Sequence, residues 1–277
     1  PAGIWGNKQD GLLNGSNTQA SSTNYNNCFA DTRKWVIDEL IDYIAPQIYF
    51  SFAYSRAAYG ELATWWSDVC RGKNVHLYIG MALYKINDSS DKYFTSDNGV
   101  PEFTRQLKFN TVKPEIRGDI MFRVQNLNDS KKQPVVNAMK NLRTTKALAP
   151  VMAWKSGAAP ENPVNGKLEV LSNNLKLTWT DDDFDTSYYA VYRFNSGDSF
   201  DINSDASAKN LVATIRKAKS GEQQFVDTSS SDPEKVFYVV TALDRLHNES
   251  SGLTISTKQS KYFSDVGLQY SWAISAI

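Results

Sequence analysis

The chain has 277 residues but only two histidines, and it carries no excess of charge of either sign. Its 30 basic residues equal its 30 acidic ones, which argues against nucleic acid or another polyanion as a partner. His76 and His247 each lack a second ligand nearby, so we expect no metal site. We also expect no cofactor, because the chain has no glycine-rich phosphate loop.

Long hydrophobic runs and a signal peptide are also lacking. No apolar run approaches the roughly 20 residues that a helix needs to span a bilayer, so no transmembrane segment is predicted. The chain begins with Pro1 and not with methionine, which indicates a processed or cloned piece of a longer protein. The lack of a signal peptide in this piece therefore says nothing about export. The two cysteines, Cys28 and Cys70, would pair in some secreted proteins or stay two unpaired thiols, and the sequence decides neither.

The first half of the chain alternates strand-like and helix-like segments. Apolar runs at 41–52, 75–85 and 116–126 have the length of buried strands, and helical stretches at 59–71 and 101–110 separate them. This order predicts an α/β fold with a parallel sheet, here a (β/α) barrel of the TIM type over residues 1–155. Two further helices are expected at 31–39, capped by Asp31, and at 135–144, and the segment 147–154 is expected to close the domain.

The second half has a different period. A linker rich in Pro, Gly, Ala and Asn covers 156–165, and short alternating strands follow over 166–256. They predict an all-β, immunoglobulin-like sandwich that needs no helix. The tail, 257–277, has a new pattern in which Asp265 would cap an amphipathic helix, the start of a truncated third module.

Several segments of the first half match a known family. They are GIWGN at 3–7, ADTRKW at 30–35, IDYIAPQIYF at 41–50, Trp65-Trp66, VHLYIGMALYK at 75–85, Gln106-Leu107, the strand around Gly118 and ALAPVMAW at 147–154. By these segments the first half resembles the glycosyl-hydrolase-like family 10, a group of bacterial barrel proteins related to glycoside hydrolases. The resemblance implies a barrel that begins before Pro1, so that this chain holds only its rear half, and Gly6 departs from the larger basic residue expected there.

The remaining segments resemble two other modules. The sandwich is similar to a fibronectin type III module in LKLTW at 175–179, YYAVYRF at 188–194 and YVVTALDRLHNES at 238–250. The tail, with FSDV and SWAISAI, is similar to the first helix of an S-layer homology domain, a module that binds cell-wall polymers. Together they imply a secreted bacterial protein held at the cell envelope.

A glycoside hydrolase needs two carboxyl groups across the scissile bond, and α/β barrels keep their chemistry at the C-terminal strand ends. The three predicted strand ends carry none. Asp42 and Asp119 lie early in their strands, which favours structural roles. Asp88, Asp91 and Asp129 are loop acids that are exposed by default, with a catalytic role as the alternative. We therefore expect the catalytic acids, which remain unidentified, in the missing front half.

The strand ends do carry side chains of the types that can bind sugars. Gln47 either ties the barrel backbone or binds sugar hydroxyls, because a buried amide needs partners. Tyr49 and Tyr84 either stack on a sugar ring or pack in the core, and Lys85 either contacts a sugar or forms a salt bridge to a loop. Asn7, at the end of the matching segment 3–7, completes the substrate-binding candidates. The paired Trp65 and Trp66 are expected in the core.

The leading hypothesis is a fragment of a secreted, cell-envelope glycoside-hydrolase-like protein that acts on polysaccharide or oligosaccharide. A non-catalytic carbohydrate-binding or scaffold protein and a structural spacer are the alternatives. We expect the fragment to be inactive alone. Half a barrel would expose sheet edges and apolar faces, so a homodimer through that half is also expected.

Overall fold

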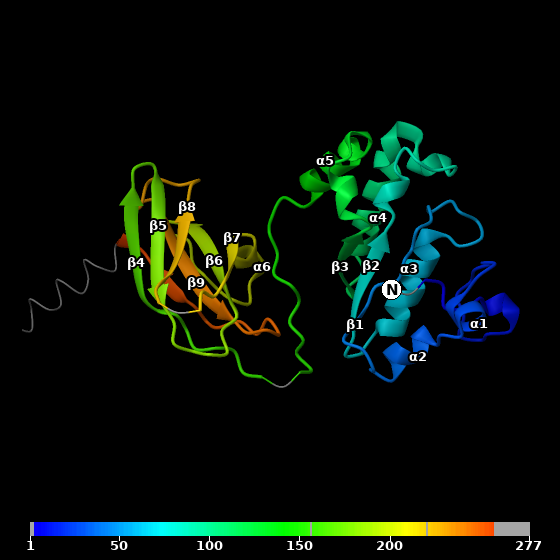
Figure 1. Ribbon diagram of the computed structural model, residues 1–277, viewed down its shortest axis with the longest axis horizontal. Helices are drawn as coiled ribbons and strands as arrows, with labels where there is room; N and C mark the ends of the chain where they lie inside the picture. Colours follow the sequence, from blue (N-terminus) through cyan, green and yellow to red (C-terminus); the bar gives the residue numbers. More distant parts are fainter. Residues whose placement is uncertain (1–2, 156, 220, 258–277) are drawn as a thin grey trace, which may run out of the picture. The chain divides into compact units, whose positions relative to one another are not determined.

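The computed structural model describes residues 3–155, 157–219 and 221–257 (Figure 1). The chain divides into two compact units, Pro1–Thr144 and Thr145–Ile277. The predicted tail helix after Asp265 lies outside the described residues. Within the described residues, none of the helices has the length and apolar character required to cross a bilayer.

The first unit alternates strands and helices, as the sequence predicts. Its three strands are β1 (Tyr43–Ile44), β2 (His76–Met81) and β3 (Ile116–Met121). The connecting helices are α3 (Tyr59–Cys70) and α4 (Val100–Thr111), and α5 (Gln133–Leu142) follows β3. The shorter elements are η1 (Lys8–Asp10), α1 (Asn24–Cys28), α2 (Thr32–Ile37), η2 (Leu83–Lys85), η3 (Lys92–Phe94), η4 (Ser96–Gly99), η5 (Val124–Leu127) and η6 (Ser130–Lys132).

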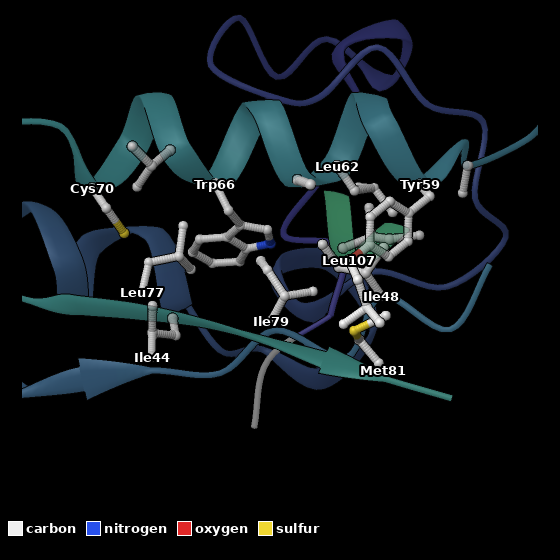
Figure 2. Close-up of a cluster of buried hydrophobic side chains, with 14 of the residues drawn as sticks. Ile44, Ile48, Tyr59, Leu62, Trp66, Cys70, Leu77, Ile79, Met81 and Leu107 are labelled. Atoms are coloured by element: carbon white, nitrogen blue, oxygen red, sulfur yellow. The ribbon is translucent and has the colours of Figure 1, made fainter. Parts of the chain in front are cut away.

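The three strands form one parallel sheet in the order β1-β2-β3. Side chains alternate across a strand, so Leu77, Ile79 and Met81 share one face of β2, and all three are fully buried. Figure 2 shows α3 lying over this face, with Trp66 and Leu62 pointing down toward the sheet. The parallel order is as predicted, and assignment to part of a TIM-type barrel stays a prediction.

The strand predicted over 41–52 is wrong in its extent, because only Tyr43–Ile44 forms a regular strand. Pro46 has no N–H to donate to the ladder, which interrupts the strand. The chain nevertheless continues beside β2. Pro46 accepts from the Gly80 amide at 2.8 Å, and the Ile48 amide donates to the Gly80 carbonyl at 3.0 Å.

Two local predictions for the helices are confirmed. Asp31 caps α2, since its carboxylate accepts from the Lys34 amide at 3.0 Å. Trp66 is fully buried, and Trp65 is partly buried, packs against the same core and stacks on Trp5 with ring centroids 5.8 Å apart. Both tryptophans also bond outside their helix, because each indole N–H donates to a backbone carbonyl at 3.0 Å.

The two cysteines are free thiols in the structure. Cys28 is exposed, and Cys70 is buried at the end of α3. Burial, together with the charge of Glu115, raises the pKa of the Cys70 thiol to about 12. Cys70 therefore behaves as a small apolar core residue.

The second unit contains two antiparallel sheets, as expected for a β-sandwich. One sheet has the order β10-β9-β6-β7 and the other β4-β5-β8. The fibronectin type III assignment stays a prediction. The strands are β4 (Val164–Leu171), β5 (Asn174–Thr180), β6 (Tyr188–Asn195), β7 (Leu211–Arg216), β8 (Gln223–Asp227), β9 (Val236–Leu243) and β10 (Leu253–Ile255). The expectation that the sandwich contains no helix is wrong, because a short helix, α6 (Asp205–Ala208), lies between β6 and β7.

The sandwich core follows the predicted period of two. Trp179 on β5, Tyr189 on β6 and Tyr238 on β9 are fully buried and belong to one hydrophobic cluster. The other face of β6 and β9 is buried as well, in a cluster that includes Tyr192 and Phe194. This second cluster lies on the outer side of its sheet, since residues alternate between the faces.

A segment outside the predicted sandwich packs on part of that outer face. Leu148 packs against the second cluster, and the Met152 amide donates to the Leu246 carbonyl at 3.4 Å. The segment 147–154, which was expected to close the first domain, thus belongs with the second unit, whose boundary falls at Thr145. Strand β4 begins at Val164, inside the predicted linker.

Candidate functional site

The C-terminal ends of the parallel strands bring three aromatic rings together. Tyr49 follows β1, Tyr84 lies in η2 after β2, and Phe122 directly follows β3. The ring centroids of Tyr49 and Tyr84 are 5.8 Å apart, and each lies 5.9 Å from that of Phe122. We name these three residues the strand-end aromatic cluster. The sequence predicted the two tyrosines but missed Phe122, whose signal was its place right after the strand Ile116–Met121.

Backbone hydrogen bonds fix the position of these rings. The Phe122 amide donates to the Met81 carbonyl at 2.9 Å, and the Tyr84 amide donates to the Phe122 carbonyl at 3.1 Å. These bonds continue the pairing of β2 with β3 beyond the regular strands. The rings of Tyr84 and Phe122 are therefore held by the sheet itself, as expected of groups that bind a ligand on a rigid scaffold.

The two tyrosines are half-buried but not part of the closed core. Burial raises the pKa of the Tyr49 hydroxyl, with a further contribution from Tyr84, and burial raises the pKa of Tyr84 too. Phe122 is 45% exposed. Because both hydroxyls stay neutral, each can donate a hydrogen bond to a sugar while its ring offers an apolar face.

Lys85 supports the cluster from within the protein. Its Nζ donates to the Tyr49 carbonyl at 2.6 Å and lies 5.6 Å from the ring centroid of Phe50. Burial lowers the pKa of Lys85, and the charge of Asp91 opposes this shift. The ammonium group thus bonds to the backbone, and among the residues that the structure describes it forms no ion pair with a loop carboxylate. A salt bridge to a loop was one of the two alternatives for Lys85.

Gln47 lies at the same edge and differs from its expected environment. It pairs with Gly80 in an isolated parallel bridge, but its side chain is exposed and not buried. Within the described residues its amide makes no hydrogen bond to the protein. The two alternatives for Gln47 were a tie to the barrel backbone and the binding of sugar hydroxyls. The exposed amide is compatible with the second.

Asn7 has a different environment. It is buried, and its amide makes four hydrogen bonds within the N-terminal loop. Nδ2 donates to Asp10 and to the Ala20 carbonyl, both at 2.8 Å, and Oδ1 accepts from the Thr18 hydroxyl at 2.7 Å and the Ala20 amide at 3.1 Å. These bonds use the amide's usual capacity, so they favour a role in holding the loop.

Three of the acidic residues near the strands have structural partners. Asp119 accepts from Asn110 Nδ2 at 2.6 Å and lies 3.1 Å from an Arg143 guanidinium nitrogen. Asp91 and Asp129 cap the short helices η3 and η6. Asp42 and Asp88 are exposed. The segments 47–50, 82–85 and 122–126, which form the strand ends, contain no carboxylate.

No metal centre accompanies the cluster. Across residues 3–155, 157–219 and 221–257, no group of three or more His, Cys, Asp or Glu side chains is arranged to hold a metal ion. The rings of the strand-end aromatic cluster and the two tyrosine hydroxyls offer aromatic stacking and neutral hydrogen bonding to a ligand.

Comparisons with known proteins show similarity to glycosyl hydrolases. Residues 1–96 match the family model described as Glycosyl hydrolase-like 10. The chain is 36% identical over 263 residues to the glycosyl hydrolase YngK of Bacillus subtilis (strain 168), which covers 93% of this chain and 49% of that protein. It is 43% identical over 143 residues to the glycosyl hydrolase DigH of Escherichia coli (strain K12), covering 51% of this chain and 32% of that protein. The chain thus spans at most about half the length of these relatives.

Among solved structures, a Fn3-like protein from Clostridium thermocellum is 21% identical and covers 35% of this chain and 91% of that chain. Its TM-score is 0.27, which is too low to support an argument about the fold.

Proposed function

We propose that the chain is part of a glycoside hydrolase that acts on polysaccharide, and that the strand-end edge contacts the sugar. The observation that carries this proposal is the strand-end aromatic cluster, with the exposed Gln47 amide on the same edge. Flat aromatic faces beside a few polar groups are typical of sugar-binding sites. The similarity of residues 1–96 to a glycosyl-hydrolase-like family supports the same ligand class.

The catalytic carboxylates, by this proposal, lie outside the described residues. The strand ends contain no acid, and the nearby Asp91, Asp119 and Asp129 are engaged as caps or in a structural network. The described part would then bind and orient the glycan while acids elsewhere in the whole protein carry out the bond cleavage. A non-catalytic carbohydrate-binding module is the second candidate, and the same lack of acids favours it.

Binding measurements on the full chain test the sugar contact. Calorimetric titration with neutral and amino-sugar hexasaccharides should reveal at least one ligand. The Gln47→Ala variant should bind that ligand about fivefold more weakly, since one hydrogen bond contributes about 1 kcal/mol. The matched control is Gln224→Ala, an exposed glutamine on β8. A panel with no ligand, or an equal loss in both variants, would overturn the proposal.

The place of the protein in the cell is also a proposal. We infer export and attachment to the bacterial envelope from the resemblance of residues 257–277 to a cell-wall-binding module. Cell fractionation of the source bacterium with an antibody to this chain is the test, and recovery in the cytoplasm alone would refute the inference.

A homodimer through the first unit is proposed from exposed apolar residues on one sheet face. Tyr43 is 55% exposed and Ile120 is 44% exposed. Both lie on the face opposite Leu77, Ile79 and Met81, because Tyr43 pairs with His76 and Ile120 with Gly80. An exposed apolar face of this kind is a common site of association.

A further inference from the structure

A pocket at one end of the sandwich has no role in the function proposed above. Its volume is about 900 Å³, and it opens where the β5–β6 and β9–β10 loops meet the end of β7. The lining includes aromatic, hydroxyl and basic side chains from these three places. It is separate from the strand-end aromatic cluster, which belongs to the other unit.

Two rings in the pocket lie nearly parallel. The ring centroids of Tyr188 and His247 are 6.1 Å apart, with an angle of 12° between the planes. Phe184, on the same lining, is 91% exposed. Flat ring faces that remain accessible offer stacking surfaces for a ring-shaped ligand.

The loop that carries His247 is tightly organised. Oδ1 of Asp244 accepts from the amides of Leu246 and Asn248, both at 2.8 Å. His247 itself has a positive φ of 65°, a conformation that non-glycine residues adopt only where their surroundings impose it. The His247 ring is thus placed beside Tyr188 by its own loop.

The charges in the pocket are partly unpaired. Asp181 is satisfied, because it accepts from the Tyr189 hydroxyl at 2.9 Å and lies 3.5 Å from Lys217 Nζ. Arg216 and Arg245 are exposed and form no ion pair within the part of the chain that the structure describes. The planar guanidinium group pairs well with two oxygens of a carboxylate or a phosphate. The acids Asp182 and Glu222 also border the pocket, so the local field is not uniformly positive.

A buried hydroxyl in the lining also lacks a partner. Thr186 is 5% exposed, and its Oγ1 makes no hydrogen bond within the described residues. Buried polar atoms are nearly always bonded, because an unpaired one loses its hydrogen bonds to water without replacement. A ligand group that reaches Thr186 from the pocket would satisfy it.

We propose that this pocket binds an acidic sugar residue of a glycan, one that carries a carboxylate or a phosphate group. The sugar ring would stack on Tyr188 and His247, its anion would meet Arg216 and Arg245, and a hydroxyl would bond to Thr186. The choice of a saccharide rests on the proposed function, whereas the requirement for an anion rests on the pocket alone. The sandwich would thereby anchor the protein to an acidic polysaccharide.

Titration of the full chain with three probes tests this proposal. The probes are a tetragalacturonate, glucose 1-phosphate and a neutral cellotetraose. We expect either acidic probe to bind at least about tenfold more tightly than the neutral one, a difference of about 1.4 kcal/mol. A result in which neither acidic probe binds, or in which the neutral one binds equally well, would overturn the proposal.

Variants localise the binding. The double change Arg216→Gln and Arg245→Gln should weaken binding of the acidic probe about tenfold or more, as expected for lost charge-assisted hydrogen bonds. Thr186→Val, which removes only the hydroxyl, should weaken it about fivefold. Lys167→Gln removes an exposed base on β4 outside the pocket and should have no effect. An equal loss in Lys167→Gln would show diffuse charge attraction and no site.

The strand-end variant separates the two proposals. Gln47→Ala should leave the affinity for the acidic probe unchanged, because Gln47 lies in the other unit. If no neutral sugar binds at the strand ends but the acidic probe still binds at the sandwich, the function proposed above fails and this inference stands. Loss of acidic-probe binding in Gln47→Ala would place that binding at the strand ends and overturn the inference.

Discussion

Glu102 Oε1 accepts a hydrogen bond from the Phe52 amide at 2.8 Å, so helix α4 holds the chain that follows β1. Gln106 Nε2 donates to the same oxygen at 2.8 Å and to the Phe50 carbonyl at 3.1 Å. The backbone at 50–52 is therefore anchored directly after Tyr49. This buried polar link connects a core helix to the strand-end aromatic cluster.

Glu102→Ala should destabilise the first unit and loosen the edge that carries Tyr49. The Phe52 N–H and the Gln106 amide would lose their acceptor, at a cost of about 1–3 kcal/mol in the free energy of unfolding. Urea unfolding measures the loss. Glu102→Gln keeps an acceptor oxygen and should cost less, and equal effects of the two changes would contradict this account.

Gly80→Ala should destabilise the sheet because the two neighbouring backbones lie close together. A Cβ on Gly80 would lie 3.0 Å from the Pro46 carbonyl oxygen, which backbone bonds hold in place. The expected cost is about 1–3 kcal/mol, as for other overpacked sites. Gly118→Ala is the matched control, since its Cβ would meet the Tyr78 side chain at 3.2 Å and that ring can move. Thermal melting should separate the two variants.

Asp227 should stabilise the sandwich in a pH-dependent way. It is 4% exposed and accepts hydrogen bonds from the Tyr238 hydroxyl and an Arg193 nitrogen, each at 2.8 Å. Burial alone would raise the pKa of Asp227, but the hydrogen bonds from Ser229, Tyr238 and Arg193 outweigh it and hold that pKa below its usual range. A lowered pKa means that this stabilisation is present above the unfolded value of about 3.9 and is lost as the pH falls through the folded value.

Asp227→Asn should therefore cost about 3 kcal/mol near neutral pH, the usual cost of breaking a buried charge pair, and much less in acid. Hydrogen exchange of the β8 and β9 amides at two pH values measures this. Asp232→Asn, at an exposed acid whose pKa is lowered by Lys235, should have a smaller effect. A loss for Asp227→Asn that is equal at both pH values would refute the assignment.

The proposed homodimer makes a direct prediction about size. Light scattering at low micromolar concentration should give the mass of two chains, and Ile120→Lys should shift it toward one chain by placing a charge on the exposed apolar face. Lys108→Glu, at an exposed position on α4, is the control and should leave the mass unchanged. A wild-type monomer would show that this face is not an interface.

The chain alone should not hydrolyse glycosides, because its strand ends lack carboxylates. Release of reducing sugar from a panel of polysaccharides is the measurement. Hydrolysis that disappears on changing Asp88, Asp91 or Asp129 to Asn would show that an acid of this chain is catalytic.

The sequence predicted the elements whose pattern is local. The segment that became α3 has its apolar residues at helical spacing, and Leu175, Leu177 and Trp179 alternate along β5, so both were found. The start of strand β4 at Val164 was missed because most residues of the strand are exposed and it shows little alternation. The extent of β1 was overestimated because the apolar pattern continues through Pro46, which cannot donate to the sheet.

The sequence predicted the location of the candidate site residues along their strands but not the contacts that their side chains make. Tyr49, Tyr84 and Lys85 do lie at the strand ends, but the direction of the Lys85 ammonium depends on the Tyr49 carbonyl, which is distant in sequence. Burial of Asn7 depends on a loop that closes back through Thr18 and Ala20. The exposure of Gln47 likewise depends on neighbours that the apolar run does not show.

The packing of Leu148 on the outer face of β6 and β9 has a practical consequence for any rearrangement of this protein. A sandwich that is transplanted into another protein from residue 166 onward would lose the packing of Leu148 on the cluster that includes Tyr192 and Phe194, and more of that apolar face would be exposed to water. A transferred sandwich should therefore start at Thr145, so that it includes the residues that precede the first sandwich strand and pack on its outer face.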